Sequence, residues 1–406
     1  GPSGGRGAMS DNVPAIRFAG FTEPWEQRKL GDITHRITRK NEGESNLPLT
    51  ISAQYGLVDQ RTFFNNQVAS KDMSGYYLLR RGEFAYNKST SGDSPWGAVK
   101  RLEKYEKGCV STLYICFGLD GTDPGYLVTY YETDRWYKAV QMIAAEGARN
   151  HGLLNIAPDD FFDTVLTLPS SRGEQKLIGT LFAHIDNLIT LHQRKHDQLT
   201  TLKKSLLEKM FPKPGSDVPE LRFAGFAEPW EQRKLGEIAG STYGGGTPKT
   251  DNADYWGDGI PWIQSSNVVE GSLFDVDIPK AITAAGLTGS AAQIVPAESI
   301  AVVTHVGVGK LVYLPFSFTT SQDFVSLSRL STDPTFTCYA LYGRLRKDLH
   351  VVQGSAIKGI TKEDLLSKEI EVPPMAEQKA IGSFLCSLDN LITLHQRKHD
   401  QLATLK

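Results

Sequence analysis

The sequence predicts an α+β protein with an internal repeat, in which two regions of mixed α/β character are each followed by a long helix. Residues 13–33 read VPAIRFAGFTEPWEQRKLGDI and residues 218–238 read VPELRFAGFAEPWEQRKLGEI, so 17 of 21 positions are identical. Residues 186–199 and 389–402 are the same fourteen residues, DNLITLHQRKHDQL. Between these shared segments the halves differ almost completely, which indicates a repeated framework that carries two unlike inserts.

The composition is that of an ordinary globular protein. The 406 residues are 40% hydrophobic and 22% charged, and two domains of about 150 residues each are expected for this length. No run of about 18 apolar residues is present, so no membrane span is expected. Residues 1–12 begin GPSGGRGAMS, which resembles an expression tag with its linker, and no signal peptide follows.

Charge and cysteine content restrict the function further. The net charge is −2, whereas a protein that binds nucleic acid unaided usually has a basic surplus. A nucleic-acid surface would therefore need locally clustered bases, or partners that supply part of the charge. The four cysteines form no C-x-x-C pair, which favours free thiols in a reducing cytosol over disulfides or a zinc site.

Residues 174–211 and their second copy carry the strongest local pattern. Apolar positions recur in steps of four and three residues, which is typical of the a and d positions of a coiled coil. A single helix over 174–211 would be about 57 Å long, and it can bury its apolar face only against a similar helix, which the repeat supplies. The predicted a and d positions are Leu181, Ile185, Leu188, His192, Lys195, Leu199, Leu202 and Leu206, and in the second copy Phe384, Leu388, Leu391, His395, Lys398, Leu402 and Leu405.

The middle of this pattern is polar, at His192, Lys195 and their copies. Buried polar residues there would fix the alignment of the two helices at a cost in stability. The alternative is that this stretch faces solvent, and the sequence leaves both readings open. The first helix must end before PKPGSDVP, because three prolines cannot continue it.

The two variable regions read as mixed structure with short strands. Residues 108–119, 299–309 and 324–331 carry β-branched and aromatic runs that predict strands. Each region closes with a short helix and an extended segment, at 157–170 and 361–374. Pro158 suits a first helical turn, and Thr361 with Asp364 is close to a capping box.

Candidate binding residues in the second variable region are polar side chains beside glycines. Residues 241–268 are rich in hydroxyl, amide and aromatic side chains, and three consecutive glycines would permit positive φ and close approach to a ligand. HVGVGKL (305–311) is not a P-loop, because Leu follows the lysine. The alternatives are a solvated loop packed on Trp256 and Trp262 and a plain turn between strands. The candidates are Tyr243, Gly245, Thr247, Lys249, Gln264, Ser265, Ser266, Asn267, His305, Lys310, Thr320, Gln322 and Lys358.

Candidates in the first variable region lie in three short segments. HRITRK (35–40) is a basic cluster, residues 86–101 combine small hydroxyl side chains with bases, and residues 146–152 read EGARNHG. The alternative for the basic cluster is surface charge without function. The candidates are Arg36, Arg39, Lys40, Lys88, Ser89, Thr90, Ser91, Trp96, Arg101, Arg149 and Asn150.

The sequence offers no catalytic or metal motif. H-E-x-x-H, G-x-S-x-G and F-x-G-x-G are absent, and four of the nine histidines are paired across the two helix copies. We therefore expect no enzymatic activity from this chain alone.

Several segments together resemble the specificity subunit of a type I restriction–modification enzyme. They are PWEQRKLG in both copies, GGGTPKTDNADYWGDGIPWIQSSNV, FTTSQDFVSLS, GSAIKGITKEDLLSKEIEVPPMAEQKAIG and the doubled DNLITLHQRKHDQL. Each motif alone is weak, but the doubled combination is specific and covers the chain from about residue 13 onward.

The resemblance implies two target recognition domains, at residues 13–170 and 218–372, joined through a 212–217 linker. It implies two antiparallel conserved spacer helices, at 171–211 and 373–406, which set the gap between two DNA half-sites and dock two modification subunits. It further implies that double-stranded DNA is the ligand and that this non-catalytic subunit needs no cofactor. Modification subunits would bind S-adenosylmethionine and methylate adenine at N6, and restriction subunits would use ATP and Mg²⁺ for translocation and cleavage, all in the bacterial cytoplasm.

Two other function classes remain open on the sequence alone. One is a coiled-coil scaffold with two protein-binding domains and no DNA contact. The other is a self-contained nuclease or methyltransferase, which the missing motifs disfavour. A salt titration with duplex DNA separates the first class from a DNA-binding protein.

Overall fold

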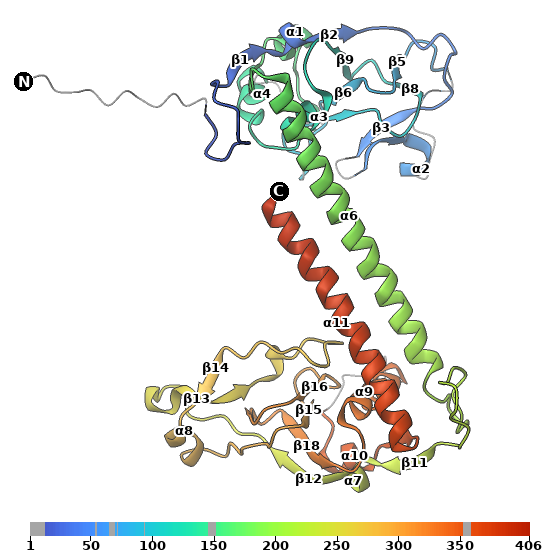
Figure 1. The fold of residues 1–406 in the computed structure, drawn as a ribbon, viewed down its shortest axis with the longest axis vertical. Coiled ribbons are helices and arrows are strands. Elements are labelled where there is room, and N and C mark those ends of the chain that lie inside the picture. Colours follow the sequence, from blue (N-terminus) through green and yellow to red (C-terminus); the bar gives the residue numbers. More distant parts are fainter. Residues whose placement is uncertain are drawn as a thin grey trace, which may run out of the picture. The chain divides into compact units, whose positions relative to one another are not determined.

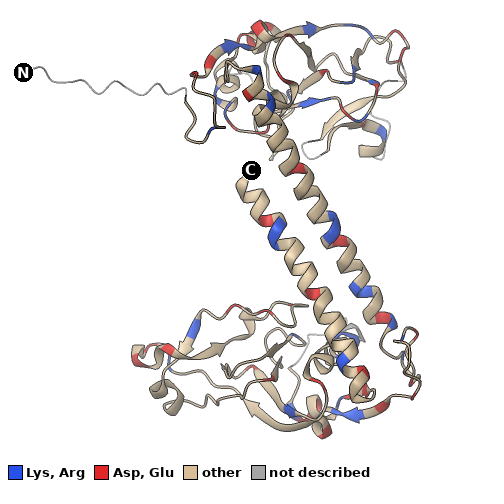
Figure 2. Ribbon diagram, viewed as in Figure 1, with Lys and Arg blue, Asp and Glu red and all other residues tan. Residues whose placement is uncertain are grey.

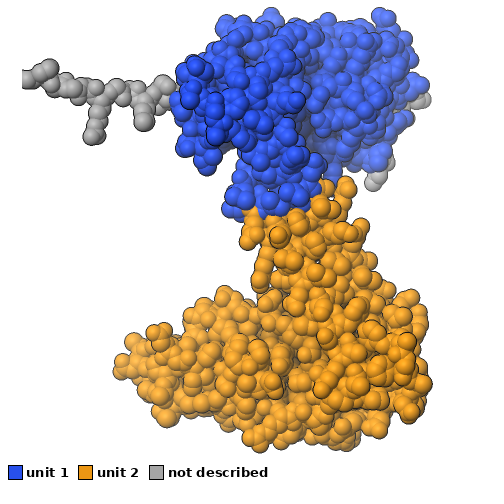
Figure 3. Space-filling view, in the orientation of Figure 1, with its two compact units in different colours: residues 1–189, 402–406 blue, residues 190–401 orange. Residues whose placement is uncertain are grey.

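The structure is a computed structural model that describes residues 13–52, 55–64, 70, 72–92, 94–144, 152–351 and 359–406. The chain divides into two compact units (Figure 3). Unit 1 comprises residues 1–189 and 402–406, and unit 2 comprises residues 190–401. Both units mix strands with helices (Figure 1), as the α+β prediction requires.

Unit 1 begins with short strands and ends with helices. Its elements in chain order are β1 Glu26–Lys29, α1 Leu30–Ile33, β2 Thr34–Ile37, β3 Leu49–Ser52, β4 Gly56–Asp59, α2 Gln60–Phe64, β5 Tyr77–Arg80, β6 Phe84–Asn87, β7 Ala98–Arg101, β8 Lys107–Val110, β9 Ile115–Leu119, α3 Pro124–Tyr131, α4 Tyr137–Ile143, α5 Pro158–Phe162 and β10 Val165–Leu168. Helix α6, Arg172–Lys209, follows and continues into unit 2.

Unit 2 repeats the same plan. Its elements are β11 Glu231–Lys234, α7 Leu235–Ile238, β12 Ala239–Gly244, η1 Ala253–Tyr255, β13 Trp256–Ile263, η2 Ser265–Asn267, β14 Lys280–Ile282, α8 Ala284–Thr288, β15 Ser299–Val303, β16 Leu311–Leu314, β17 Thr319–Thr320, β18 Phe324–Leu330, α9 Pro334–Val351, α10 Lys362–Ser367, β19 Glu369–Val372 and α11 Met375–Leu405.

Each unit contains a four-stranded antiparallel sheet with the same strand order. The order is β2-β9-β6-β7 in unit 1 and β12-β18-β15-β16 in unit 2. A separate pair joins the shared N-terminal segment to the strand before the long helix, with Glu26 opposite Leu168 and Glu231 opposite Val372. The topology therefore repeats even where the sequences are unrelated.

The remaining strands differ between the units. Unit 1 adds two antiparallel pairs, β3 with β4 and β5 with β8. Unit 2 adds a three-stranded sheet, β14-β13-β17, in which β13 and β17 run parallel. These additions are inserted at two matching points of the common sheet: β3, β4 and β5 lie between β2 and β6 as β13 and β14 lie between β12 and β15, and β8 lies between β7 and β9 as β17 lies between β16 and β18. The unlike sequences thus form unlike substructures on a common base.

The common sheet is buried on both faces, which explains its apolar strands. In β15, Ile300 and Val302 join one core cluster, whereas Ala301 and Val303 join another. Successive side chains of a strand point to opposite faces, so a strand covered on both sides needs a continuous apolar run. The SIAVV sequence of β15 supplies such a run.

The core of unit 1 is aromatic. Phe84 of β6 stacks on Phe117 of β9 with 5.3 Å between ring centroids, and Tyr86 stacks on Phe161 of α5 at 4.5 Å. Offset ring pairs of this kind add to the burial of apolar area. Burial raises the pKa of Tyr86 above its ordinary value.

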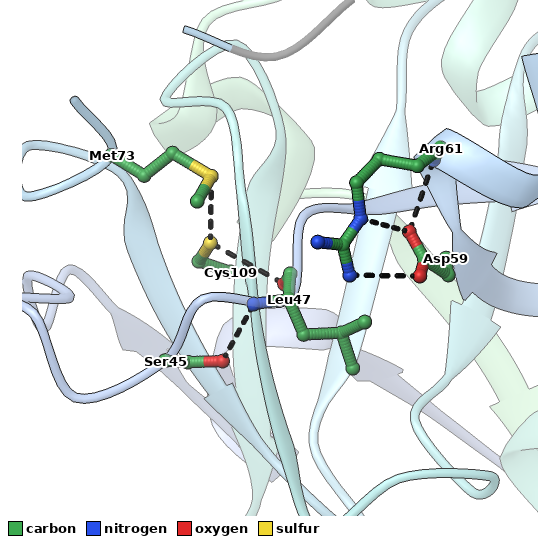
Figure 4. A network of polar contacts seen from close by, with 6 residues as sticks. All are labelled: Ser45, Leu47, Asp59, Arg61, Met73 and Cys109. Carbon is green, nitrogen blue, oxygen red and sulfur yellow. Dashed lines mark hydrogen bonds and ion pairs between the residues drawn. The ribbon is translucent and has the colours of Figure 1, made fainter. Parts of the chain in front are cut away.

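Polar contacts hold the added strands of unit 1 together (Figure 4). Arg61 of α2 donates from Nε and Nη2 to the two carboxylate oxygens of Asp59, at 3.1 and 2.9 Å. The Cys109 thiol of β8 donates to the carbonyl of Leu47 at 3.4 Å and contacts Met73 Sδ at 3.7 Å. Burial raises the pKa of Cys109 to about 11, so this group is a neutral thiol. All four cysteines are free, as predicted.

A buried ion pair ties the shared N-terminal segment to the start of each long helix. Arg17 donates from Nε and Nη2 to Glu174 at 2.7 and 2.8 Å, and Arg222 makes the same two bonds to Glu377 at 2.7 Å each. Both glutamate side chains are fully buried. Loss of either arginine would leave an uncompensated buried carboxylate, so these pairs fix the framework in both units.

The residue after each glutamate adds a second link. Gln175 accepts from the N–H of Asp123 at 2.9 Å and donates to the carbonyl of Pro169 at 2.8 Å. In unit 2 the same two bonds join Gln378 to Asp333 at 2.8 Å and to Pro373 at 2.7 Å. Since Asp123 and Asp333 also accept from backbone N–H groups in the first turns of α3 and α9, the long helices hold these helices in place.

A glycine lets each long helix approach another helix closely, α6 with α3 and α11 with α9. A Cβ on Gly179 would lie 2.5 Å from the backbone carbon of Gly125, and a Cβ on Gly382 would lie 2.9 Å from the backbone nitrogen of Phe336. Both distances are too short for any side chain. The framework therefore requires glycine at these two positions.

The structure confirms several local predictions. Helix α6 covers the predicted span, β15 and β18 are strands, and Pro158 lies in the first turn of α5. The Thr361 hydroxyl accepts from the N–H of Asp364 at 3.0 Å. Within residues 108–119, where short strand-like runs were predicted, the structure has β8 and β9, separated by a turn at residues 111–114 with a hydrogen bond from Tyr114 N–H to the Ser111 carbonyl.

Within unit 2, helices α6 and α11 pack antiparallel. His192 and His395 meet with their Nδ1 atoms 2.9 Å apart, and Lys203 lies 2.5 Å from Asp389. The Asp389 carboxylate also accepts from the hydroxyl of Tyr339 at 2.6 Å. Of the polar residues in the middle of the heptad pattern, His192 and His395 are thus in contact across the helix pair.

The prediction of the packed helix face is wrong at about half of its positions. The exposed heptad residues keep 41–48% of their surface: Leu181, Leu188, Leu202, Phe384 and Leu391; Leu405 keeps 73%. Lys195 and Lys398 are exposed as well. The half-buried residues of the two helices include the neighbouring positions Phe182, Ile189, His196, Ile392 and His399 as well as the predicted Ile185, His192, Leu199, His395 and Leu402, and the predicted Leu388 is buried. The apolar stripe is wider than one helix partner can cover, so one edge of it remains exposed.

Candidate nucleic-acid interface

The candidate residues of unit 2 lie on loops that touch one another. The Thr247 hydroxyl donates to Gln322 Oε1 at 2.6 Å, and Gly246 N–H donates to the Thr320 carbonyl at 2.8 Å. These contacts join the loop that follows β12 to the segment between β17 and β18. Side chains separated by about 75 residues in the sequence are therefore neighbours.

The loop between β15 and β16, residues 304–310, joins the same cluster. Thr304 donates from its backbone N–H and its hydroxyl to the Asp323 carbonyl, at 2.7 and 3.0 Å. Because Gln322 contacts Thr247 and Asp323 contacts Thr304, residues 321–323 connect the two loops. Gly307 and Gly309 have φ of 86° and 91°, which only glycine adopts readily.

Exposure separates the candidates of unit 2 into three groups. The exposed side chains are Thr247, Lys249, Ser266, His305 and Gln322. The half-buried ones are Tyr243, Gln264, Ser265, Asn267 and Lys310. Thr320 is fully buried, and its hydroxyl has no partner within the described residues. The prediction of Thr320 as a contact residue is therefore wrong for this structure, because a residue with no exposed surface cannot reach a ligand.

Two of the three consecutive glycines, Gly245 and Gly246, are required by packing and not by positive φ. None of Gly244, Gly245 and Gly246 has a positive φ. A Cβ on Gly245 would lie 1.9 Å from the Ser321 carbonyl, and one on Gly246 would lie 2.4 Å from Ala291. The expected positive φ is therefore wrong, whereas the contact of the half-buried Gly245 with a ligand stays a prediction.

Two tryptophans hydrogen-bond to the loop that follows β12. Trp256 Nε1 donates to the Lys249 carbonyl at 3.1 Å, and Trp262 Nε1 donates to the Gly246 carbonyl at 3.0 Å. The two indoles pack edge to face with centroids 5.0 Å apart. Lys280 lies over the Trp256 ring, and both line a cavity of about 610 Å³. These contacts also agree with the alternative interpretation, a solvated loop that packs on Trp256 and Trp262.

The candidates of unit 1 gather around the loop between β6 and β7, residues 88–97. Thr90 N–H donates to the Gly152 carbonyl at 2.6 Å, and Leu154 N–H donates to the Lys88 carbonyl at 3.0 Å. Lys88 Nζ donates to the Ile156 carbonyl at 3.2 Å, and burial lowers the pKa of Lys88. Ser89 and Ser91 are exposed beside it.

Three candidates of unit 1 make internal contacts. Arg39 donates from Nη2 to both carboxylate oxygens of Glu83 at 2.7 and 2.8 Å, and Arg101 donates to the Gly82 carbonyl at 3.2 Å. Trp96 packs against the aromatic core. Arg36 and Lys40 are exposed, with Arg36 Nη1 3.8 Å from Asp159 and Lys40 Nζ donating to the Gly75 carbonyl at 3.0 Å.

The candidate loops of the two units occupy equivalent places. The β6–β7 loop and the β15–β16 loop follow corresponding strands of the common sheet. Ile360 N–H donates to the Thr304 carbonyl at 2.7 Å, as Leu154 N–H does to that of Lys88. Arg149, Asn150 and Lys358 lie outside the described residues.

Charge does not divide the molecule into faces. Figure 2 shows Lys and Arg interspersed with Asp and Glu in both units. Within the described residues no cluster of three or more His, Cys, Asp or Glu is arranged to bind a metal. Of the helices described, none has the length and apolar character needed to cross a membrane.

Sequence reasoning missed two charged residues beside the β15–β16 loop. Arg346 of α9 and Glu270 line a cavity together with His305 and Lys310. Arg346 sits in a helix without any motif, so only the folded chain brings it to the loop. No signal in the sequence could have found it.

Comparison with known proteins gives consistent results. The family model described as type I restriction modification DNA specificity domain matches residues 227–404. The putative type I restriction enzyme MjaX specificity subunit of Methanocaldococcus jannaschii is 26% identical over 98% of this chain and 94% of its own length. The EcoR124I/EcoR124II specificity subunit of Escherichia coli is 29% identical over 40% of this chain and 41% of its own length.

One solved structure shares the fold. The type I restriction–modification system S subunit from M. genitalium superposes with a TM-score of 0.54, covers 94% of this chain and 93% of its own, and is 12% identical. At this identity the likeness concerns architecture alone, and it agrees with the mixed helix and strand plan predicted from the sequence.

Proposed function

We propose that each unit reads one half of a bipartite DNA site. The reason is that residues 227–404 match the type I restriction modification DNA specificity domain, and that the chain resembles a specificity subunit over nearly its whole length. One observation carries the proposal. Two units with the same sheet order and the same buried framework present unlike loops at equivalent places. Such an arrangement suits two different sequences read by one kind of domain.

The loops have the chemistry for base and phosphate contacts. Hydroxyl and amide side chains hydrogen-bond base edges in the major groove, and lysine and arginine bind phosphates. In unit 2 the exposed Thr247, Lys249, Ser266 and Gln322 would make these contacts, with Tyr243, Gln264, Ser265 and Asn267 beside them. In unit 1 they would come from Arg36, Lys40, Ser89, Thr90 and Ser91, with Lys88.

The long helices would dock two modification subunits and set the gap between the half-sites. Supporting this, the exposed edge of the apolar stripe occurs in both copies: Leu181, Leu188, Leu191 and Leu202 correspond to Phe384, Leu391, Leu394 and Leu405. Apolar patches of this kind mark protein interaction sites. A doubled patch fits two copies of one partner.

The partners would supply what this chain lacks. A specificity subunit has no catalytic site of its own, so S-adenosylmethionine would bind the modification subunits, and ATP with Mg²⁺ the restriction subunits. The mixed charge of this chain fits a protein that holds DNA within a complex, because partners then contribute phosphate contacts. Such a complex acts on DNA in the bacterial cytoplasm.

Exchange of the first variable region tests the proposal. Residues 34–170 are replaced by the same region of a relative with another specificity, and the assembled complex modifies genomic DNA. Methylation-sensitive long-read sequencing should show one half-site changed and the other half-site and the gap retained. A change in both halves, or in neither, contradicts the proposal.

A salt titration tests DNA contact itself. Binding of duplex DNA should weaken steeply with salt, since phosphate contacts release counterions. The mixed charge favours running it with and without modification subunits. Absence of binding in both cases would support a scaffold with two protein-binding domains instead.

A further inference from the structure

A cavity of about 320 Å³ in unit 2 lies between the β15–β16 loop and helix α9. Its ionisable lining consists of one acid and three bases: Glu270, His305, Lys310 and Arg346. Gly307, Val308 and Gly309 complete the wall. Glycine-rich backbone beside lysine and arginine is the kind of lining that binds phosphate groups.

The loop backbone places Lys310 at this cavity. The lysine side chain crosses Gly307, with its Cε 3.4 Å from where a Cβ on that glycine would lie. Within the described residues no carboxylate forms an ion pair with Lys310, and no acceptor is bound to the N–H groups of Val306, Gly307 and Val308. A cation and three backbone donors therefore remain available on one loop.

Arg346 faces this loop but is held by an acid. Its Nη1 donates to Glu270 Oε1, and lies 3.4 Å from the Tyr342 hydroxyl. The guanidinium lies 5.8 Å from the Tyr342 ring centroid. The Arg346 and Glu270 side chains are 41% and 61% exposed. Exposed pairs contribute little, so a phosphate can displace Glu270 readily.

His305 has a different role. The Thr304 hydroxyl donates its only proton to the Asp323 carbonyl, so it accepts from His305 Nδ1–H across 3.1 Å. The Nδ1 of His305 is therefore engaged within the protein, and we assign the phosphate to Lys310 and Arg346.

We propose that this cavity binds one phosphodiester of the DNA backbone, with Lys310 and Arg346 on its oxygens. Glu270 holds Arg346 in position until the phosphate replaces it. The Glu270 carboxylate also weakens the binding of any DNA that places no phosphate in this cavity. This inference rests on the proposed function and names one contact of that interface.

The test uses the full chain purified with its modification subunits. Anisotropy of a labelled duplex is recorded over a range of KCl concentrations for R346Q, E270Q and the double variant. K347Q is the matched control, because Lys347 is exposed on the same helix and the charge change is equal. R346Q should weaken binding about tenfold at low salt and reduce the salt slope by about 1.

The other variants sharpen the expected result. K347Q should leave affinity and slope unchanged within about twofold, and E270Q should strengthen binding about threefold. The gain from E270Q should vanish in the R346Q background, because Glu270 acts through that arginine.

Three outcomes overturn the inference and are distinguishable. If the unaltered complex binds no duplex at any salt concentration, the proposed function fails with it. If that complex binds but R346Q keeps the original slope, only the phosphate contact is wrong. If calorimetry shows that inorganic phosphate binds the chain but not R346Q, while the DNA slope is unchanged, the cavity takes free phosphate instead.

Discussion

The two units share a framework and differ in what it carries. In both, an arginine of the N-terminal segment meets a buried glutamate, the next glutamine links two backbone groups, and a glycine lets helices touch. Above this framework, unit 1 adds two antiparallel strand pairs and unit 2 adds a sheet with a parallel pair. The comparison teaches that the shared residues are those that buried contacts require, whereas the loops can differ in sequence.

This division has a physical cause. A fully buried carboxylate needs its partner, and a helix contact that excludes a Cβ needs glycine. Loop residues at the surface meet no such demand. Different loops can therefore be exchanged on one framework without loss of folding, which a protein that reads different DNA sequences requires.

The largest expected effect breaks the framework itself. Gly179→Ala and Gly382→Ala each place a Cβ against backbone atoms, and each should destabilise its unit by about 3 kcal/mol. If the framework is equivalent, the two losses should be similar. Denaturant unfolding, followed by hydrogen exchange in each unit, measures both.

Gly343→Ala is the control for these variants. Gly343 lies within α9, and a Cβ there meets no atom within 4 Å. This change should stabilise the chain by about 0.5–1 kcal/mol, from helix propensity alone. Equal behaviour of all three variants would contradict a packing role for Gly179 and Gly382.

The next effect concerns the place where the two helix copies meet. Replacing His192 and His395 together by leucine should stabilise the chain by about 2 kcal/mol, because two half-buried polar rings become apolar. The melting temperature should rise, while light scattering should reveal additional oligomers from misaligned helices. An unchanged melting temperature would indicate that the pair contributes nothing to the contact.

The same variant should lose a pH dependence. Burial, and then the nearby His395, Lys398 and His399, lower the pKa of His192. The folded state then binds fewer protons than the unfolded state, whose histidine pKa is about 6.5. Stability is complete above that pH and falls as the pH drops through the lower folded pKa. Melting curves between pH 7.5 and about 5 should show that the melting temperature of the original chain falls as the pH drops, and that it falls less in the double variant. The neighbouring titratable residues Asp197, Asp400 and His196 are the same in both chains.

Much of the fold could be predicted from the sequence, because repeats and periodicity report long-range order. The doubled segments revealed the framework, and helix α6 and strands β15 and β18 followed from local pattern. The buried helix face could not be chosen from the sequence, since Leu188 and Ile189 are both apolar, and only the folded chain leaves Leu188 exposed and Ile189 half-buried. Periodicity defines a stripe, not the part of it that a partner covers.

The site was harder to predict because its residues come from separate segments. Polar loops were found by composition, but Thr320 proved buried and Arg39 proved paired with Glu83. Arg346 carries no local signal at all. Burial and ion pairing depend on neighbours that the sequence does not place side by side.

The smallest expected effect separates two neighbouring bases in unit 1. Arg39 is held by Glu83, whereas Lys40 is exposed, with Nζ donating to the Gly75 carbonyl and lying over the Tyr77 ring. Arg39→Gln should cost about 1 kcal/mol of stability and leave the salt slope of DNA binding unchanged. Lys40→Gln should leave stability unchanged and reduce the slope by about 1. If both variants reduced the slope equally, Arg39 would leave Glu83 to bind DNA, and the division between framework and loops would not hold at this strand.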